Sequence, residues 1–195
     1  HLKDCSIITK DLQTSSLCRH YDKADTLSRR KLYLSLLDLK LRTSFTKDGS
    51  KPLIGLVNSI VRCLDKESYC LLEYELRVIQ DSFCLEDFYF LDLIAGGFIE
   101  KLNRIIVSRD PTLLEIMVSI VKVMLLKVYD TCYENCVKNE LICSHFPEEL
   151  DCAMEMLSEP GQNAARELLT TMTEFGPGLT PSMAASESSS DDGIG

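Results

Sequence analysis

Features that mark several common classes of protein are scarce or missing in this chain of 195 residues. It has three histidines and no tryptophan. It lacks the glycine-rich phosphate loop of nucleotide-binding proteins and the nucleophile elbow of hydrolases. Two Cys–His pairs, Cys18 with His20 and Cys143 with His145, are only two positions apart. A cysteine and a histidine two positions apart in a chain seldom have the geometry in which the histidine acts as a base on the thiol. We therefore predict a protein that is not an enzyme and uses no cofactor.

Long hydrophobic runs are also absent. The most apolar segment, 113–129, has 17 residues and contains Lys122 and Lys127, whereas a membrane-spanning helix needs about 20 apolar residues. The chain begins with His1 rather than methionine, and no basic-then-apolar leader is visible. We expect no membrane span, no signal peptide in this sequence, and a fragment or processed form of a larger chain or assembly.

The net charge is −9, and the charged residues are distributed unevenly along the chain. Residues 1–51 contain 11 Lys and Arg against 6 Asp and Glu, and residues 52–195 contain 10 against 24. Lys and Arg supply most contacts to nucleic-acid phosphates, so the acidic body argues against direct nucleic-acid binding. Hydrophobic residues make up 45% and charged residues 26% of the chain, which is ordinary for a folded soluble protein.

The nine cysteines do not indicate a disulfide framework, because an odd number cannot pair completely. Several of them, including Cys63, Cys70 and Cys152, lie within apolar helical patterns, where cysteine behaves as a small hydrophobic residue. We therefore expect most cysteines to be buried in packed helices. We also expect a reducing location, in the cytoplasm or the nucleus.

Four side chains within 14 residues allow a different interpretation: Cys132, Cys136, Cys143 and His145. Residues four apart share a face of a helix, and three thiolates with one imidazole can bind zinc tetrahedrally. The usual pair of cysteines separated by two residues is absent. A zinc-stabilised helical regulatory module is therefore one alternative, and a secreted all-α signalling protein with partial disulfides is another.

Apolar residues follow a helical period through most of the chain, and no segment alternates as a strand does. The sequence predicts mostly loop over 1–24, a helix over 25–42 capped by Asp25 or Ser28, and a turn at Asp48-Gly49. Further helices are expected from Pro52 and over 67–81, 85–95, 98–107 and 111–133. The fold class predicted is all-α.

Two segments, Pro52–Ile79 and Gly97–Val121, repeat each other. Matching residues lie 45 positions apart before a three-residue gap and 42 apart after it. A looser third copy spans Met154–Met172. The matched pairs are Ile54 with Ile99, Val57 with Leu102, Asn58 with Asn103, Ile60 with Ile105, Val61 with Ile106, Asp65 with Asp110, Leu71-Leu72-Glu73 with Leu113-Leu114-Glu115, Leu76 with Val118, Val78 with Ile120, and Ile79 with Val121.

This period resembles that of armadillo and HEAT repeats, which are built from two or three helices each. The sequence Leu93-Ile94-Ala95-Gly96-Gly97-Phe98-Ile99-Glu100-Lys101-Leu102 is similar to the armadillo junction, where a short helix ends at glycine. Ser108-Arg109-Asp110-Pro111 resembles the turn before the long third helix of that repeat.

The resemblance covers about 52–175 and implies a short α-solenoid there, and the sequence as a whole divides into three parts. These are an N-terminal segment with a capping helix (1–51), armadillo-like repeats (52–175) and a disordered Ser/Asp-rich acidic tail (176–195). Two segments depart from the pattern. Residues 130–147 interrupt the spacing as an insertion or an extended helix end, and the helix over 25–42 lacks a partner.

In the families that the chain resembles, the repeat surface binds a peptide or another protein. The resemblance therefore implies a non-catalytic scaffold or adaptor. Armadillo proteins usually place their peptide-binding asparagines on the third helix, whereas the two matched asparagines here lie on the preceding one. The candidate partner-binding residues are Asn58, Tyr74, Arg77, Asn103, Lys122 and Tyr129.

The tail offers two candidate phosphorylation sites. Ser188 and Ser189 each have an aspartate three positions on, at Asp191 and Asp192. This spacing suits an acid-directed kinase, and phosphorylation would add further negative charge.

Overall fold

The computed structural model describes residues 13–44, 50–64, 69–85 and 91–173. All regular structure in these ranges is helical, so the all-α prediction is confirmed. The described helices are α2 (Thr14–Asp22), α3 (Leu27–Ser44), α4 (Ser50–Cys63), α5 (Tyr69–Phe83), α6 (Leu91–Ala95), α7 (Phe98–Ile106), α8 (Pro111–Val128), α9 (Glu134–Cys143), α10 (Phe146–Ala153), the 3₁₀ helix η2 (Met154–Met156) and α11 (Glu159–Thr173).

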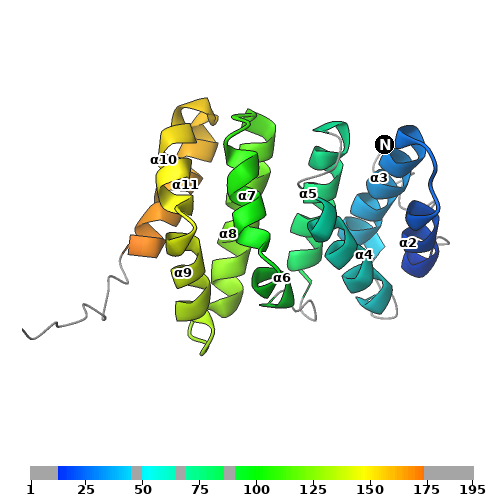
Figure 1. The fold of residues 1–195 in the computed structure, drawn as a ribbon, viewed down its shortest axis with the longest axis horizontal. Coiled ribbons are helices and arrows are strands. Elements are labelled where there is room, and N and C mark those ends of the chain that lie inside the picture. Colours follow the sequence, from blue (N-terminus) through cyan, green and yellow to red (C-terminus); the bar gives the residue numbers. More distant parts are fainter. Residues whose placement is uncertain (1–12, 45–49, 65–68, 86–90, 174–195) are drawn as a thin grey trace, which may run out of the picture.

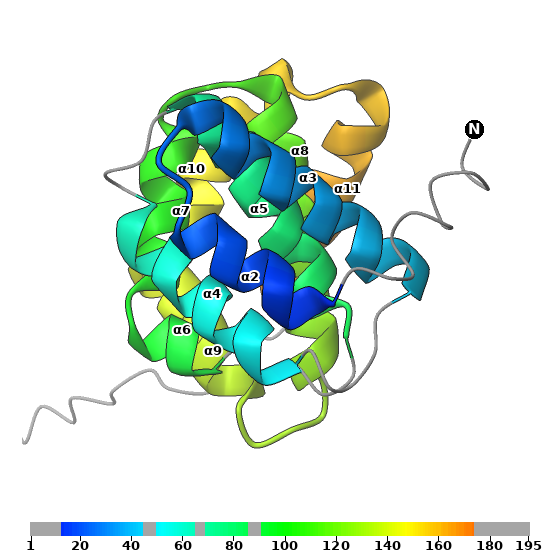
Figure 2. The same ribbon diagram turned by 90° about the vertical axis from the view of Figure 1, so that its right-hand side faces the viewer.

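Most of the helices form consecutive pairs that lie side by side along the long axis of the molecule (Figure 1). The pairs are α2 with α3, α4 with α5, α7 with α8, and α10 with α11. Helix α3 packs on α5, α5 on α8, and α8 on α11, so these four make one layer. Helix α2 packs on α4, and α7 on α10, in a second layer (Figure 2).

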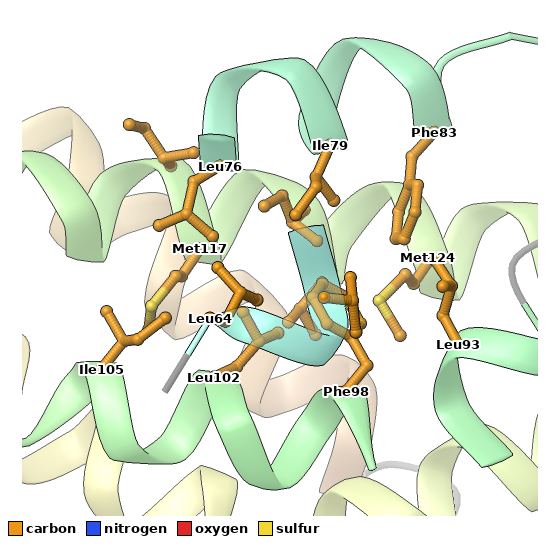
Figure 3. Packing of buried hydrophobic residues seen from close by; sticks show 14 of the residues in the cluster. Leu64, Leu76, Ile79, Phe83, Leu93, Phe98, Leu102, Ile105, Met117 and Met124 are labelled. Carbon is orange, nitrogen blue, oxygen red and sulfur yellow. The ribbon is translucent and has the colours of Figure 1, made fainter. Parts of the chain in front are cut away.

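The core lies between the two layers. Side chains from α5, α7 and α8 and from the end of α4 converge there, as Leu76, Leu102 and Met117 do in Figure 3. Phe83 of α5 and Phe98 of α7 meet edge to face, with ring centroids 5.7 Å apart. Both phenylalanine side chains are fully buried. Burial of these apolar side chains is the main force that joins the layers.

The internal repeat of the sequence corresponds to two neighbouring pairs of helices. The first copy forms α4 and α5, and the second forms α7 and α8. Eight matched positions are buried in both copies: Val57 and Leu102, Ile60 and Ile105, Val61 and Ile106, Leu71 and Leu113, Leu72 and Leu114, Leu76 and Val118, Val78 and Ile120, and Ile79 and Val121. Equivalent apolar positions therefore have equivalent places in the core.

The N-terminal region differs from the prediction of a loop over 1–24 and a helix without a partner. Residues 14–22 form α2, which packs on α3. Its buried residues Thr14, Leu17, Cys18 and Tyr21 have the spacing of a helix face. Only two of these four are strongly apolar, so the hydrophobic pattern was weak.

The cap of α3 also differs from the prediction. Thr26, rather than Asp25 or Ser28, accepts a hydrogen bond at its hydroxyl from the backbone N–H of Arg29, at 3.3 Å. The Asp25 carboxylate instead accepts a 2.9 Å hydrogen bond from the Arg29 guanidinium. Asp25 therefore stays at the exposed surface and does not cap the helix.

The helix predicted over 111–133 ends at Val128, and 134–143 form a separate helix, α9. Asp130 adopts a positive φ of 57°, which turns the chain out of the helix. The Glu134 carboxylate then accepts a 2.7 Å hydrogen bond from the Asp130 N–H. The predicted interruption at 130–147 is therefore an insertion with a helix of its own.

Two predicted junctions are present at the expected residues. Gly97, with φ +79°, immediately precedes α7, and this left-handed conformation favours glycine. Pro111 begins α8, and the Asp110 carboxylate caps that helix by accepting a 3.1 Å hydrogen bond from the Leu113 N–H. The helix predicted over 85–95 is shorter, since α6 begins at Leu91 and residues 86–90 lie outside the described ranges.

Truncation of Phe83 tests the core. We expect Phe83→Ala to lower the free energy of unfolding by about 3–5 kcal/mol, because it removes a fully buried ring and leaves a cavity. Leu32→Ala is the control, since Leu32 is 54% exposed, and should change stability by less than about 0.5 kcal/mol. Urea denaturation measures both, and equal effects would contradict this description of the core.

Candidate functional site

Polar contacts link neighbouring helices across the layer of α3, α5, α8 and α11. The Arg42 guanidinium donates to Asp81 at 2.6 Å, joining α3 to α5. The Gln80 amide donates to the Ser119 hydroxyl at 2.7 Å, joining α5 to α8. The Lys122 ammonium donates to Glu167 at 2.6 Å, joining α8 to α11. These partners lie 39, 39 and 45 positions apart, so one kind of contact recurs along this layer.

Two of the predicted partner-binding residues lie on α5 in this layer. Tyr74 is half-buried, and the Lys31 ammonium lies 5.5 Å from the centre of its ring. Arg77 donates two hydrogen bonds, of 3.1 and 2.9 Å, to one carboxylate oxygen of Glu73. Both side chains are thus held by neighbours rather than projecting freely.

The two matched asparagines lie in the other layer, on α4 and α7. The Asn103 amide donates to the backbone carbonyl of Ser144, between α9 and α10. Its side-chain oxygen is buried without a hydrogen-bond partner. Asn58 is half-buried on α4. The structure therefore separates Asn58 and Asn103 from the other predicted residues, and Asn103 tethers neighbouring helices.

Lys122 and Tyr129 come together at a pocket between α8, α9 and α11. Its volume is about 80 Å³, and it opens to solvent. Leu126 of α8 and Tyr129, which directly follows this helix, lie at the rim and are 67% and 64% exposed, although the helix is otherwise largely buried. The lining residues are Lys122, Leu125, Leu126, Tyr129, Glu134, Lys138, Glu167, Leu168 and Thr171.

Two ion pairs border this apolar pocket. Lys122 pairs with Glu167, and the Lys138 ammonium pairs with the Glu134 carboxylate at 2.6 Å. The Lys138 side chain is only 7% exposed. The Lys138 ammonium, together with the backbone N–H of Asp130, lowers the pKa of Glu134. The pocket therefore has an apolar floor, with positive and negative groups balanced at its edge.

The sequence did not predict most of this pocket, because its lining comes from three helices. In the sequence, the sign of this site was the position of Leu126. It is an apolar residue at a position of α8 that points away from the buried stripe. The contributions of α9 and α11 depend on how these helices pack on α8, which the helical period alone does not specify.

The cysteines are much more exposed than the sequence predicted. Among the described cysteines Cys18 is buried and Cys63 half-buried, whereas the other six are exposed: Cys70, Cys84, Cys132, Cys136, Cys143 and Cys152. The expectation that most are core residues, with Cys70 and Cys152 as examples, is wrong. These residues lie at turns or on the outer faces of their helices, where a small apolar side chain tolerates solvent.

The proposed zinc ligands are not gathered together. Within the described ranges no group of three or more His, Cys, Asp or Glu side chains is placed to hold a metal ion. Cys132 lies in the turn before α9, Cys136 and Cys143 lie on α9, and His145 precedes α10. Disulfides are likewise missing among the described cysteines.

The Cys18–His20 pair lacks the arrangement of an activated nucleophile. Burial, reinforced by the negative charge of Asp22, raises the pKa of the Cys18 thiol to about 12, so the thiol stays protonated at neutral pH. The His20 ring stacks on Tyr33, with centroids 5.5 Å apart.

The candidate phosphorylation sites Ser188 and Ser189 lie outside the described residues, as does the whole predicted tail over 176–195.

Comparisons with protein-family models, with curated proteins and with solved structures find no match to this chain. None of the helices in the described ranges combines the length and the apolar character needed to cross a membrane.

One carboxyl group in the layer of α3, α5, α8 and α11 is sensitive to pH. The Arg42 guanidinium binds both Asp38, at 2.8 Å, and Asp81, at 2.6 Å. Burial, with the hydrogen bond and the negative charge of Asp81, raises the pKa of Asp38 from 3.8 to about 6. Arg42 and Arg77 act in the opposite direction. A raised carboxyl pKa means that the fold favours the protonated form, so stability falls as pH rises through about 6.

We expect Asp38→Asn to remove this loss of stability. At pH 7.5 the variant should be more stable than the natural chain by about 1–2 kcal/mol, and at pH 4 the difference should vanish. Asp25→Asn is the control, because the exposed pair with Arg29 is worth less than about 0.5 kcal/mol. Urea denaturation at both pH values measures the effect. A stability difference between Asp38→Asn and the natural chain that does not depend on pH would contradict the assignment.

Proposed function

We propose that this chain is a short armadillo-like helical-repeat stack that binds a protein or peptide partner and has no catalytic role. The four consecutive pairs of helices support this interpretation, since each pair packs mainly on its neighbours. Contacts between neighbouring pairs join residues 39 to 45 positions apart, close to the length of an armadillo or HEAT unit. Such stacks offer extended surfaces on which partners bind.

The observation that carries the proposal is the exposure of Leu126 and Tyr129 beside an apolar pocket. Contiguous apolar surface is unusual on a protein with no partner, and it commonly marks an interaction site. Leu125 and Leu168 are buried at the floor of the pocket. An apolar side chain of a partner would cover Leu126 and Tyr129 and displace water from this floor. It would thereby gain the burial energy that dominates small contact sites.

The ion pairs at the edge of the pocket constrain the kind of partner. Lys122 with Glu167 and Lys138 with Glu134 balance each other in charge, so the pocket itself selects neither an acidic nor a basic anchor. We infer that an apolar or aromatic side chain of the partner occupies the centre. The exposed pair of Lys122 and Glu167 would form part of a polar rim.

Substitution of Leu126 tests this site. We expect Leu126→Asp to lose at least tenfold in affinity for a partner recovered with the natural chain, because it places a charge in the apolar contact. Val107→Asp is the matched control. It also places an aspartate at an exposed apolar residue, directly after α7, and should keep the partner. Affinity capture from cells that express the chain identifies the partner, and calorimetry measures its affinity.

Two results would contradict the proposal. Failure to recover any stable partner would argue against a binding module. Equal affinity of the natural chain and Leu126→Asp would place the contact elsewhere on the stack. Circular dichroism checks that both variants keep the helical content of the natural chain.

We further propose a cytoplasmic or nuclear location, since the odd number of cysteines favours free thiols. Thiol titration of the protein, unfolded without reductant, is expected to count all nine cysteines as free. A lower count would favour the alternative of a secreted signalling protein with partial disulfides.

A further inference from the structure

The two ends of the stack carry opposite charge. Helices α2 and α3 lie at one end, and α9, α10 and α11 lie at the other (Figure 1). Residues 14–44 contain seven Lys and Arg against three Asp. Residues 134–173 contain eight Asp and Glu against two Lys and Arg. We call these the basic end and the acidic end.

Part of this charge is not neutralised by partners within the described ranges. At the basic end, Arg19 and Lys23 are exposed, and neither forms an ion pair with a described residue. Six exposed carboxylates at the acidic end also form no ion pair with a described residue: Glu140, Glu148, Glu149, Asp151, Glu155 and Glu159. The charges are therefore available to an outside partner.

Helix α3 carries apolar residues on two sides. Leu34, Leu37 and Leu41 form its buried face. A second stripe, Leu32, Leu36 and Leu39, has the i, i+4, i+7 spacing and lies roughly opposite on the helix. Leu32 is 54% exposed, and the other two are half-buried.

This two-sided pattern suits a helix with a neighbour on each side in its layer. Helices α5 and α8 have such neighbours, because α5 lies between α3 and α8, and α8 lies between α5 and α11. Among the described helices, α3 has only α5 beside it in this layer. Its second leucine stripe thus faces the position that a preceding helix of the layer would occupy.

We propose that two copies of this chain associate head to tail, the basic end of one copy against the acidic end of the next. In this arrangement α11 of one copy takes the position beside α3 of the other, and continues the layer. A second copy fits this position because the same chain supplies both charges. Met156, 45% exposed beside the acidic residues, adds apolar contact area.

The contact uses different surfaces on the two copies, so it leaves one end of each pair free. Association of this kind forms open chains of increasing length unless the geometry closes a ring. It is independent of the pocket at Leu126, and Leu126→Asp should leave it unchanged. Because exposed charges attract across the contact, association should weaken as salt is added.

Sedimentation velocity of the natural chain tests the proposal directly. At low salt the average mass should rise above the monomer mass of 22.0 kDa as the protein concentration is raised, and at high salt it should return to that value. A monomer at every concentration and salt would overturn the proposal. The measurement is made with reductant, so that disulfides between exposed cysteines do not contribute.

Charge reversal at each end identifies the contact. The basic-end variant is Arg19→Glu with Lys23→Glu, and the acidic-end variant is Asp151→Lys with Glu155→Lys. Each variant alone should associate at least tenfold more weakly than the natural chain, since like charges would meet. A mixture of the two should recover association, because the acidic end of the first meets the basic end of the second.

The control reverses two charges on α4, which is not one of the helices of either end. Lys51→Glu with Arg62→Glu changes exposed residues of α4 and should leave association unchanged. Circular dichroism and thermal melting confirm that each variant is folded. If the mixture stays monomeric, or if the control weakens association as much as the end variants, the head-to-tail contact is wrong.

Discussion

The stack depends on the burial of helix α8 between its neighbours. Ten of its 18 residues are buried, and it packs on α5, α7, α9 and α11. Removing this much apolar surface from water supplies a large part of the free energy that joins the two layers. The helix also brings Leu125, Leu126 and Tyr129 to the pocket at its C-terminal end. Stability and the candidate site are therefore properties of the same helix.

The repeat was visible in the sequence because packing imposes it. Residues such as Val57 and Leu102, or Leu76 and Val118, are buried at equivalent places, and so they must be apolar in both copies. Glycine and proline at Gly97 and Pro111 marked ends of helices for backbone reasons that are local to the chain. Features decided by the period of apolar residues, or by one special residue, could thus be predicted.

Features decided by contacts between distant segments could not be predicted from the sequence. Helix α2 was missed because Thr14 and Tyr21 contribute to its buried face without being strongly apolar. The burial of cysteines was overestimated because a helical period does not show which side of a short helix meets solvent. Lys122 and Tyr129 were separate candidates from the long helix, and the pocket that they line also needs Lys138 of α9 and Leu168 of α11. Asn58 and Asn103 matched in sequence, yet they belong to the opposite layer.

The near-constant spacing of the contacts between neighbouring pairs has a consequence for how the chain folds. Gln80 bonds to Ser119, and Lys122 to Glu167, so each link closes a loop of similar, moderate length. Among the described helices, each pair packs mainly on pairs that are near it in the sequence, which favours rapid folding. Structure can begin at the central helices α5 and α8 and extend outward one pair at a time. Unfolding would then start by fraying of the outermost pairs.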